Sequence, residues 1–494
     1  MSLISVNNLT FGYDGSLKNI FENVSFNIDT DWKLGLIGRN GKGKTTFLKL
    51  LLGKYEYQGA ISKNVEFDYF PFEVKNKERM AIEIVNEIAP NVEDWEIIRE
   101  LNLLNTDTEV LYRSFNLLSG GEQIKILLIS LFLKGNNFLL IDEPTNHLDI
   151  ETRNNLVNYL EKKKGFILVS HDRIFLDKVV NHIISINNTN IEIQQGNFSS
   201  WKENKNRQDN FEKIQNERLQ KDINRLEIAS KNCAKWSNEA EKTKNKKYNS
   251  ETTIDKGYIG HKADKMMKKS KVMEQRIEKA INEKTNLLKN IEVNDTLKII
   301  PLKSNKNPLI FAHNLQIKYS KETIFNPITF EVNNGDRVAL IGKNGIGKSS
   351  ILKLILGEEL QYNGEFMVAN DLKISYVSQS TEDLKGNLRT FAYDNKINES
   401  IFKAMLVKMG LSQFDFDTNI QDMSEGQKKK VLIAKSISEQ ANIYIWDEPL
   451  NYIDILTREQ IEDAILNYNP TIIFVEHDEK FIEKVATKII NLVK

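Results

Sequence analysis

The feature that most constrains this chain is an internal repeat with a period of about 305 residues, much longer than a solenoid unit and close to the size of a domain plus a linker. Four distinctive residues recur in the same order: Lys44 as Lys348, Ser119 as Ser424, Asp142 as Asp447 and His171 as His477. Each half opens with an alternating, strand-like pattern and closes with a branched apolar run before a histidine. The repeat therefore predicts two α/β domains with buried strands.

Length and composition narrow the class of protein. A chain of 494 residues with 40% hydrophobic content is too long for one core and apolar enough for two. Its 68 basic and 68 acidic residues cancel, so a nucleic acid would have to be attracted by a local patch. A single cysteine and six scattered histidines exclude a disulfide framework and a Cys/His metal cluster. Neither a secretory leader nor an apolar stretch of ~20 residues is present, so we expect a cytoplasmic protein.

Two glycine-rich loops follow predicted strands and precede predicted helices. They read GRNGKGKT at residues 38–45 and GKNGIGKS at residues 342–349. Such a loop wraps backbone N–H groups around phosphate oxygens, while its lysine reaches the outer phosphates and its hydroxyl residue can bind magnesium. One copy could be a turn without a ligand, but two favour nucleotide binding. The candidate ATP-binding residues are Gly38, Asn40, Gly41, Gly43, Lys44, Thr45 and Thr46, with Gly342, Asn344, Gly345, Gly347, Lys348, Ser349 and Ser350.

An acidic pair ends a predicted apolar strand in each half, as FLLIDEP at residues 138–144 and IYIWDEP at residues 443–449. Alone, such a pair is more often a solvated turn after a strand. Downstream of a phosphate-binding loop it predicts hydrolysis, because the first carboxylate can hold magnesium and the second can polarise an attacking water. The candidate magnesium ligands here are Asp142 and Asp447 together with Thr45 and Ser349.

A third motif stands just before each acidic strand, as LLSGGEQIKILL at residues 117–128 and DMSEGQKKKVLI at residues 422–433. A serine hydroxyl and glycine N–H groups at a helix start suit a γ-phosphate held by the opposite domain. SGGEQ alone could simply be a helix N-cap with a capping-box acid. Together, the three motifs resemble those of ABC-type ATPases, over residues of about 1–200 and 306–494.

The ABC resemblance implies two nucleotide-binding domains that close head to tail over two ATP molecules. It implies that Ser424 and Gly426 complete the site of Lys44, and that Ser119 and Gly121 complete the site of Lys348. The implied catalytic residues are Glu143, Glu448 and the switch histidines His171 and His477. The implied adenine contacts are Tyr13 and Tyr319, although strand aromatics are more often core residues.

The two halves depart from the family's pattern in different ways. Gln379 matches the glutamine expected to bind magnesium and sense the attacking water, whereas the first half has Phe72 at that position. The second signature has Glu425 where the first has Gly120. We therefore predict unequal sites, with the site of Lys348 and Gln379 closer to the family consensus.

The segment between the two domains, residues 201–305, is predicted to be a helical hairpin. Apolar residues with three-four spacing follow an outgoing and a returning stretch: Leu219, Ile223, Leu226 and Cys233, then Met266, Met273, Ile277, Ala280, Leu287 and Ile291. The returning stretch would span about 45 Å at 1.5 Å per residue.

Lysines accumulate where this hairpin would turn, at residues of about 242–271, with ten lysines against three acids. Lysines interleaved with aromatic rings suit RNA, because the lysines neutralise phosphates and the rings stack on exposed bases. In an unknown protein such a stretch would more often be a solvated loop. The candidate RNA-binding residues are Lys244, Lys246, Lys247, Tyr248, Lys256, Tyr258, His261 and Lys262.

Tandem ABC domains joined by such a linker, without a membrane segment, resemble the ABC-F family, whose members act on ribosomes. The segment between Phe72 and Ser119 leaves little room for an extra arm. In this respect, and in the sequence DWKLGLIGRNGKGKTT at residues 31–46, the chain is similar to the Lsa-type antibiotic-resistance subset. That resemblance implies ATP and Mg²⁺ as cofactors and the 70S ribosome as partner, with contacts to large-subunit rRNA and P-site tRNA. It also implies displacement of lincosamides, pleuromutilins and streptogramin A compounds, with ATP hydrolysis driving release.

We expect a monomer with two intramolecular ATP sites and without a membrane partner or stable protein subunit. Two alternatives from other classes stay open at this stage. A housekeeping ABC-F translation factor would carry the same ATPase, and the ATPase subunit of a drug exporter would need a membrane partner. A DNA-maintenance ATPase is disfavoured, because it would usually carry a longer coiled coil or zinc-binding cysteines.

Overall fold

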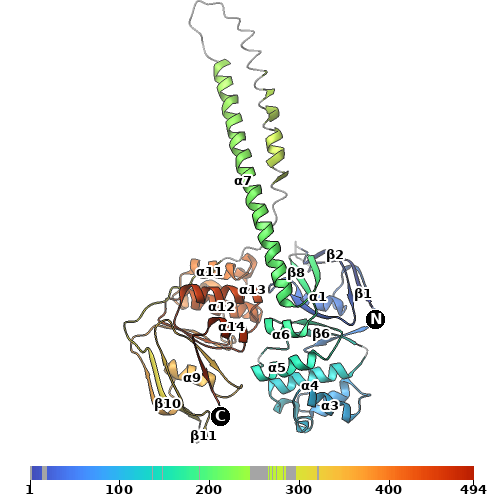
Figure 1. Cartoon of the computed structure of the whole chain (residues 1–494), viewed down its shortest axis with the longest axis vertical. Helices are drawn as coiled ribbons and strands as arrows, with labels where there is room; N and C mark the ends of the chain where they lie inside the picture. The colour runs from blue at the N-terminus through green and yellow to red at the C-terminus, as the bar shows by residue number, and fades with distance from the viewer. Residues whose placement is uncertain are drawn as a thin grey trace, which may run out of the picture. The chain divides into compact units, whose positions relative to one another are not determined.

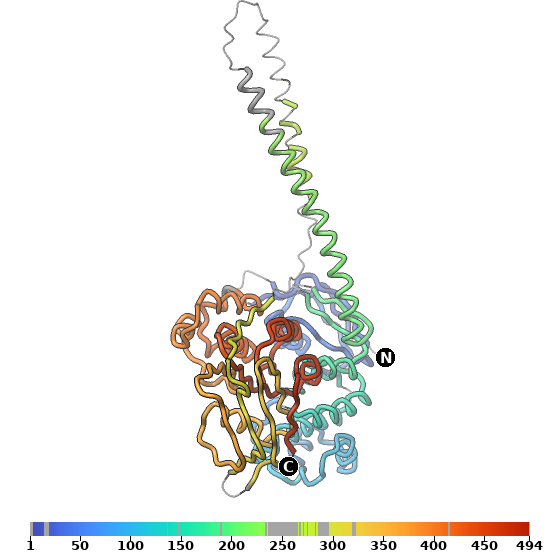
Figure 2. The backbone as a smooth tube through the Cα atoms, turned by 60° about the vertical axis from the view of Figure 1, so that its left-hand side comes forward, coloured from blue at the N-terminus to red at the C-terminus, as the bar shows by residue number. Residues whose placement is uncertain are grey.

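The structure is a computed structural model of the chain. It describes residues 3–13, 19–135, 137–146, 148–187, 190–244, 296–319 and 322–493, together with 265, 268, 269, 271–273, 275–281, 283 and 284. The chain forms two compact units: one contains Met1–Trp201 and Asn294–Lys494, and the other is Lys202–Val293. Both predicted ATPase halves belong to the first unit, and Figures 1 and 2 show them by colour, blue to green and yellow to red.

The first half contains two sheets. The smaller one is antiparallel with strand order β2-β1-β4, formed by β1 (Leu3–Phe11), β2 (Phe21–Asp29) and β4 (Gln58–Ser62). The larger one has the order β5-β6-β7-β3-β8-β9, formed by β3 (Lys33–Ile37), β5 (Glu66–Phe70), β6 (Asn137–Asp142), β7 (Phe166–Val169), β8 (His182–Asn187) and β9 (Asn190–Gln195). Its helices are α1 (Lys44–Leu51), α2 (Ala81–Ile88), α3 (Asp94–Leu103), α4 (Gly120–Leu133), α5 (Ile150–Leu160) and α6 (Arg173–Val179).

The second half repeats this plan. Its antiparallel sheet contains β10 (Ile310–Tyr319), β11 (Glu322–Thr323), β12 (Ile328–Val332) and β14 (Gln361–Val368). Its parallel sheet has the order β15-β16-β17-β13-β18, formed by β13 (Arg337–Ile341), β15 (Ile374–Val377), β16 (Ile443–Asp447), β17 (Ile472–Val475) and β18 (Lys488–Asn491). Its helices are α9 (Lys348–Ile355), α10 (Leu388–Asp394), α11 (Glu399–Lys408), α12 (Glu425–Ser438), α13 (Ile455–Tyr468) and α14 (Glu479–Val485).

The parallel sheets bring the predicted motifs to one edge. In the first half the central strand β7 pairs with β3 on one side and β6 on the other, so that Val169 lies opposite both Leu36 and Asp142. In the second half Val475 lies opposite both Leu340 and Asp447. Because carboxyl ends of parallel strands meet at the same edge, the phosphate-binding loop, the acidic pair and the histidine of each half converge there. The fold class predicted from the repeat is confirmed.

The buried strands explain why these sheets form. All four residues of β7 and all four of β17 are buried, as expected for parallel strands covered on both faces. Each half has two hydrophobic clusters, one on either side of its parallel sheet. Trp446 on β16 is the bulkiest fully buried side chain among the described residues, and its indole N–H donates to the Ser436 hydroxyl at 2.9 Å.

The second unit is helical where it is described. Helix α7 (Phe198–Lys244) begins in the first unit and provides the outgoing half of the hairpin. The described residues between 265 and 284 are helical and run beside α7, as both views show (Figures 1 and 2). Ile223 and Ile277, from the two predicted apolar stripes, are 5% and 8% exposed, and Lys284 forms an ion pair with Asp222. None of the helices in the described part of the chain is long and apolar enough to span a membrane.

Candidate functional site

The two phosphate-binding loops have the same backbone geometry. Each connects a strand to a helix, β3 to α1 and β13 to α9, and each helix is preceded by a glycine in the left-handed region, Gly43 with φ 94° and Gly347 with φ 97°. A side chain would be strained there, and at Gly43 an added Cβ would also lie 2.6 Å from Ile20. The glycine spacing is therefore required by the strand-to-helix turn itself.

The lysine of each loop folds back over its own backbone. The Lys44 ammonium donates to the carbonyl of Gly38 at 2.7 Å and to the Asn40 side chain at 3.1 Å. The Lys348 ammonium donates to the carbonyls of Gly342 and Lys343 at 2.8 and 3.0 Å. Burial lowers the pKa of both lysines, while nearby carboxylates oppose that shift. Each ammonium is thus held beside the loop at the position that a phosphate-binding lysine requires.

The hydroxyl after each lysine meets the acidic strand. Thr45 donates to Asp142 at 3.1 Å, and Ser349 hydrogen bonds to Asp447. Burial raises the pKa of both aspartates, and the hydroxyl hydrogen bonds oppose the shift. Sequence reasoning missed Tyr69, whose hydroxyl donates to Asp142 at 2.9 Å. The Asp447 Oδ1 atom is buried without a hydrogen-bond partner within the described residues, as expected of an oxygen that faces a cation site.

The predicted catalytic glutamates have unusual backbones. Glu143 and Glu448 have φ values of 53° and 46°, in the left-handed region that favours glycine. Strain of this kind concentrates at functional sites. The His171 imidazole lies 3.3 Å from Glu143, and the His477 imidazole lies 3.7 Å from Glu448.

The electrostatic environment of the first glutamate is strongly perturbed. Burial and the neighbouring Asp142 raise the pKa of Glu143 to about 7, although Lys44 and Arg458 oppose the shift. Burial, followed by the positive charge of Lys44, holds the pKa of His171 well below its usual value. The imidazole is therefore neutral at pH 7 while the carboxyl titrates there, which suits a proton acceptor.

The predicted signature serines begin helices. Ser119 caps α4 and donates to Glu122 at 2.8 Å, and Ser424 caps α12 and donates to Gln427 at 3.0 Å. Both motifs form complete capping boxes. The N-cap and signature interpretations are therefore compatible, because capping places the serine and the following N–H groups at the exposed end of the helix.

The two halves face each other head to tail across both phosphate-binding loops. The Asn40 side chain of the first loop donates to the Tyr452 carbonyl at 2.7 Å, and a Cβ added to Gly426 would lie 2.7 Å from both groups. In the second loop the backbone N–H of Asn344 hydrogen bonds to Asp149 of the first half. The ABC resemblance implies that Gly426 lies at the site of Lys44. Sequence reasoning missed the contacts of Tyr452 and Asp149, because they depend on how the halves pack.

The two interfaces differ in closeness. The atoms nearest to a Cβ added to Gly121, the counterpart of Gly426, belong to Leu148 and Thr152 of its own half, at 3.5 Å or more. The charged contact on that side is the exposed pair of Lys343 and Glu151 at 2.8 Å. The first site is thus closed more tightly against its signature glycine than the second.

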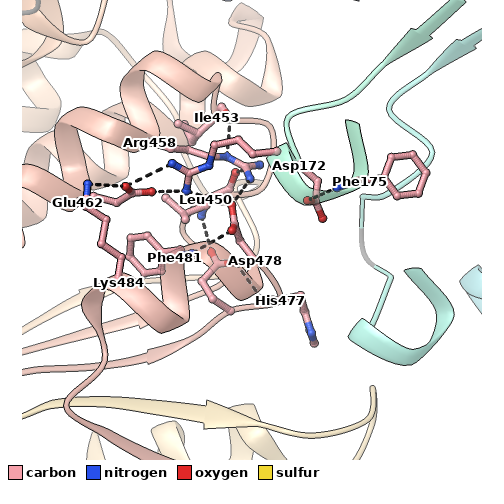
Figure 3. A network of polar contacts seen from close by, with 12 residues as sticks. Asp172, Phe175, Leu450, Ile453, Arg458, Glu462, His477, Asp478, Phe481 and Lys484 are labelled. Carbon is pink, nitrogen blue, oxygen red and sulfur yellow. Dashed lines mark hydrogen bonds and ion pairs between the residues drawn. The ribbon is translucent and has the colours of Figure 1, made fainter. Parts of the chain in front are cut away.

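A buried network of ion pairs also joins the halves (Figure 3). Arg173, which follows the switch histidine of the first half, pairs with Glu462 on α13, and both side chains are at most 4% exposed. Lys484 reaches the same glutamate at 3.0 Å, and Arg458 pairs with Asp478 at 2.9 Å. Arg153 of the first half donates to the His477 carbonyl at 2.9 Å, which connects it to the switch loop of the other half.

The other predicted site residues lie in various places. Tyr13 is 44% exposed, and its hydroxyl is 2.8 Å from the Thr46 hydroxyl. Gln379 is exposed after β15, and Phe72 packs partly buried on the core of the first half. The side chains of Tyr319 and Lys244 lie outside the described residues, as do the other predicted hairpin-tip residues Lys246, Lys247, Tyr248, Lys256, Tyr258, His261 and Lys262.

The fold and its two loops are those of a tandem P-loop ATPase. The family model described as "ABC transporter" matches residues 21–146 and again residues 325–451. The chain is 30% identical to "ATP-binding protein Uup" of Buchnera aphidicola, over 99% of this chain and 80% of that protein. It is 28% identical to "Ribosome protection protein VmlR" of Bacillus subtilis, over 96% of this chain and 84% of that protein.

A solved structure has the same fold at low sequence identity. The crystal structure of an archaeal ribosome recycling factor with a ribosomal stalk protein aligns with a TM-score of 0.62 and 18% identity, over 98% of this chain and 87% of that chain. The protein therefore belongs to the ABC family of ATPases, with an ATP-binding domain in each half.

Proposed function

We propose that this ABC ATPase is an ABC-F protein that binds the bacterial ribosome and uses its interdomain hairpin to dislodge antibiotics from the peptidyl-transferase centre. The observation that carries the proposal is the head-to-tail pairing of both halves within one chain, with Asn40 against Gly426 and Asn344 bonded to Asp149. The ribosomal part draws support from the 28% identity to a relative described as a ribosome protection protein. The proposed domains are residues 1–200 and 306–494, joined by 201–305.

Each site would hold one ATP with Mg²⁺. Lys44 and Lys348 would bind the phosphates. Thr45 with Asp142 would hold magnesium at the first site, and Ser349, Asp447 and Gln379 would hold it at the second. The residues fit a cation because a buried oxygen of Asp447 is without a hydrogen bond in the described chain. Bound Mg²⁺ would neutralise charge that develops on the transferred phosphoryl group.

The chain's own residues would complete the reaction. Glu143 and Glu448 would orient the attacking water, with neutral His171 and His477 beside them. The opposing signatures would bind the γ-phosphates, through Ser424 and Gly426 at the first site and Ser119 and Gly121 at the second. Tyr13 and Tyr319 would contact the adenines. Closure over two ATP molecules would fix the ribosome-binding state, and hydrolysis would release it.

The hairpin would supply the contact with RNA. A groove on it is lined by Lys265, Lys268, Lys269 and Arg276 around the exposed side chains of Val272 and Met273. Cations around exposed apolar groups suit phosphates and unstacked bases. The proposed contacts with large-subunit rRNA and P-site tRNA would involve this groove and the basic stretch at 242–271.

Sedimentation with 70S ribosomes tests the ATP-dependent part. The double variant Glu143→Gln/Glu448→Gln, which keeps ATP binding but loses the water-orienting carboxylates, should cosediment with ribosomes in ATP and not in ADP. The wild type should be released as it hydrolyses ATP. An absence of ribosome association by the double variant in ATP would contradict the proposal.

Susceptibility to lincomycin, tiamulin and virginiamycin M, in a sensitive host with and without the gene, tests the antibiotic part. Protection should disappear when the hairpin tip is deleted. Trapping on ribosomes without protection would instead assign the protein to the housekeeping translation factors.

The two sites are also proposed to be unequal. The second site has Gln379, and its Glu448 accepts a hydrogen bond from Asn451 at 2.7 Å. The first site has the apolar Phe72 instead of the glutamine. Glu448→Gln alone should therefore lower steady-state ATP turnover more than Glu143→Gln alone, and equal losses would argue against unequal sites.

A further inference from the structure

The second half contains a polar connection that the first half cannot form. The loop after β15, residues 378–381, is tied to helix α12 at two points. The buried Lys429 ammonium donates to the Ser378 carbonyl at 2.9 Å, and the Thr381 hydroxyl donates to the Glu425 carboxylate at 2.5 Å. Glu425 also accepts from Lys428 at 3.0 Å. The loop that carries Gln379 is therefore bonded to the helix that carries the second signature.

The same place in the first half is apolar. The aligned residues are Pro71, Val74, Gly120 and Ile124, none of which has a side chain that can make either hydrogen bond. Val74 and Ile124 pack, together with Phe72, against the hydrophobic core of the first half. The polar connection is therefore a property of one half, even though the two halves share their fold.

The Lys429 ammonium is buried near the catalytic carboxylates of its own half. This side chain is 2% exposed, and among the groups nearest to it are the carboxylates of Glu476, Glu448 and Asp447. Burial lowers its pKa, while these carboxylates oppose the shift. Glu476 is held by the backbone N–H groups of Leu450 and His477, at 2.7 and 3.0 Å. A buried cation among these acids fixes their positions relative to α12.

Helix α12 touches both sites. Its start presents Ser424 and Gly426 to the first site, where Gly426 lies against Asn40. One turn later Lys429 holds the loop that carries Gln379, which belongs to the second site. Two hydrogen bonds therefore connect the signature helix of one site to the glutamine loop of the other.

We propose that Lys429, with the Thr381–Glu425 bond, is a positioning element that makes catalysis at the second site depend on nucleotide at the first. The described residues at the aligned positions of the first half cannot form this tie, so its helix α4 cannot make the reverse connection in the same way. This inference rests on the two-site ATPase proposed above and is independent of the ribosome. It concerns positioning, since Lys429 bonds to the loop backbone and reaches the reacting groups only through it.

The test uses the full chain with Glu143→Gln, in which turnover comes from the second site. In this parent, turnover should rise sigmoidally with ATP concentration, with a Hill coefficient above one. Lys429→Ile, which supplies the residue of the first half, and Thr381→Val, which removes only the hydroxyl bond, should each bring the coefficient to one. Each variant should lower, by about fivefold or more, the factor by which nucleotide at the first site promotes turnover at the second, which is the usual size of an allosteric effect.

Two comparisons separate positioning from general damage. Lys429→Arg retains the cation and should preserve the sigmoidal curve. Lys435→Ala, on the same helix but paired with Glu439 at 3.3 Å, should match the parent. The inference is overturned if the parent is already hyperbolic, or if both Thr381→Val and Lys429→Ile keep its Hill coefficient. Failure of ribosome cosedimentation with the coupling intact would refute the proposed ribosomal function alone.

Discussion

Replacement of Glu143 by glutamine should stabilise the nucleotide-free protein at alkaline pH. The carboxylate is buried beside Asp142, and the pKa of Glu143 is raised from an ordinary value of 4.5 to about 7. Because the folded state binds this proton more tightly than the unfolded state does, stability contributed by the group is lost as the pH rises from 4.5 through 7. Glutamine has the same shape and cannot ionise, so it escapes this penalty.

The size of the effect follows from the shift. A pKa raised from 4.5 to about 7 corresponds to about 3 kcal/mol of unfolding free energy. Glu143→Gln should gain about 3 kcal/mol in unfolding free energy at pH 8 and about 1.5 kcal/mol at pH 5.5, where the unfolded carboxyl is ionised and the folded one is protonated. Urea-unfolding midpoints of the variant and wild type at the two pH values measure the difference.

A matched control is Glu192→Gln, since Glu192 is exposed on β9 in the same half. Its substitution should leave the midpoint unchanged at both pH values. A Glu143→Gln variant that is no more stable than wild type at pH 8, or is stabilised equally at both pH values, would refute the explanation by burial and by the charge of Asp142.

Three further predictions concern the interfaces. Gly426→Ala places a Cβ 2.7 Å from Asn40 of the facing half and 2.7 Å from the Tyr452 carbonyl of its own half, and it should reduce ATP turnover about tenfold. Gly121→Ala makes ordinary contacts and should keep most of the turnover, and equal losses would contradict the closer packing of the first site. Arg173→Met removes a buried cation from Glu462 and should lower the free energy of thermal unfolding by about 3–5 kcal/mol. Lys484→Met removes a half-exposed cation from the same glutamate and should lower it by less than about 1 kcal/mol. Ile277→Ala should destabilise the hairpin helices by about 2 kcal/mol, seen as faster amide exchange in residues 275–281, and unchanged exchange would contradict their packing through this residue.

The sequence predicted well what local physics determines. An apolar run such as FILV, next to glycine and a polar turn, predicts a buried strand, and all four residues of β7 are buried. The loop glycines were predictable because the strand-to-helix turn needs left-handed backbone at Gly43 and Gly347. Convergence of Asp142 with the loop hydroxyl of Thr45 followed from the parallel order of the strands.

What the sequence did not predict depends on contacts between distant parts. The pair of Arg173 and Glu462 joins residues 289 positions apart, and neither residue belongs to a repeated motif. Tyr69 lies on a strand and reads as an ordinary core aromatic, yet its hydroxyl bonds to Asp142. The partners of such polar side chains can be identified only once the packing of sheets and halves is known, because the periodicity of the sequence indicates which residues are buried and not which residues they contact.

The two nucleotide sites differ in how closely the facing glycine packs and in the loop that follows β5 or β15. These differences suggest how one chain could use two ATP molecules. At the first site the facing glycine is in close contact with Asn40, and the Phe72 position is apolar. We expect such a site to close tightly and turn over slowly, because Phe72 has no amide with which to hold an attacking water. At the second site the glycine contact is looser, and the glutamine loop is tied to the signature helix by Lys429. A slow first site that positions a faster second one would keep its own nucleotide bound, so that the second site would hydrolyse ATP only while the first is occupied.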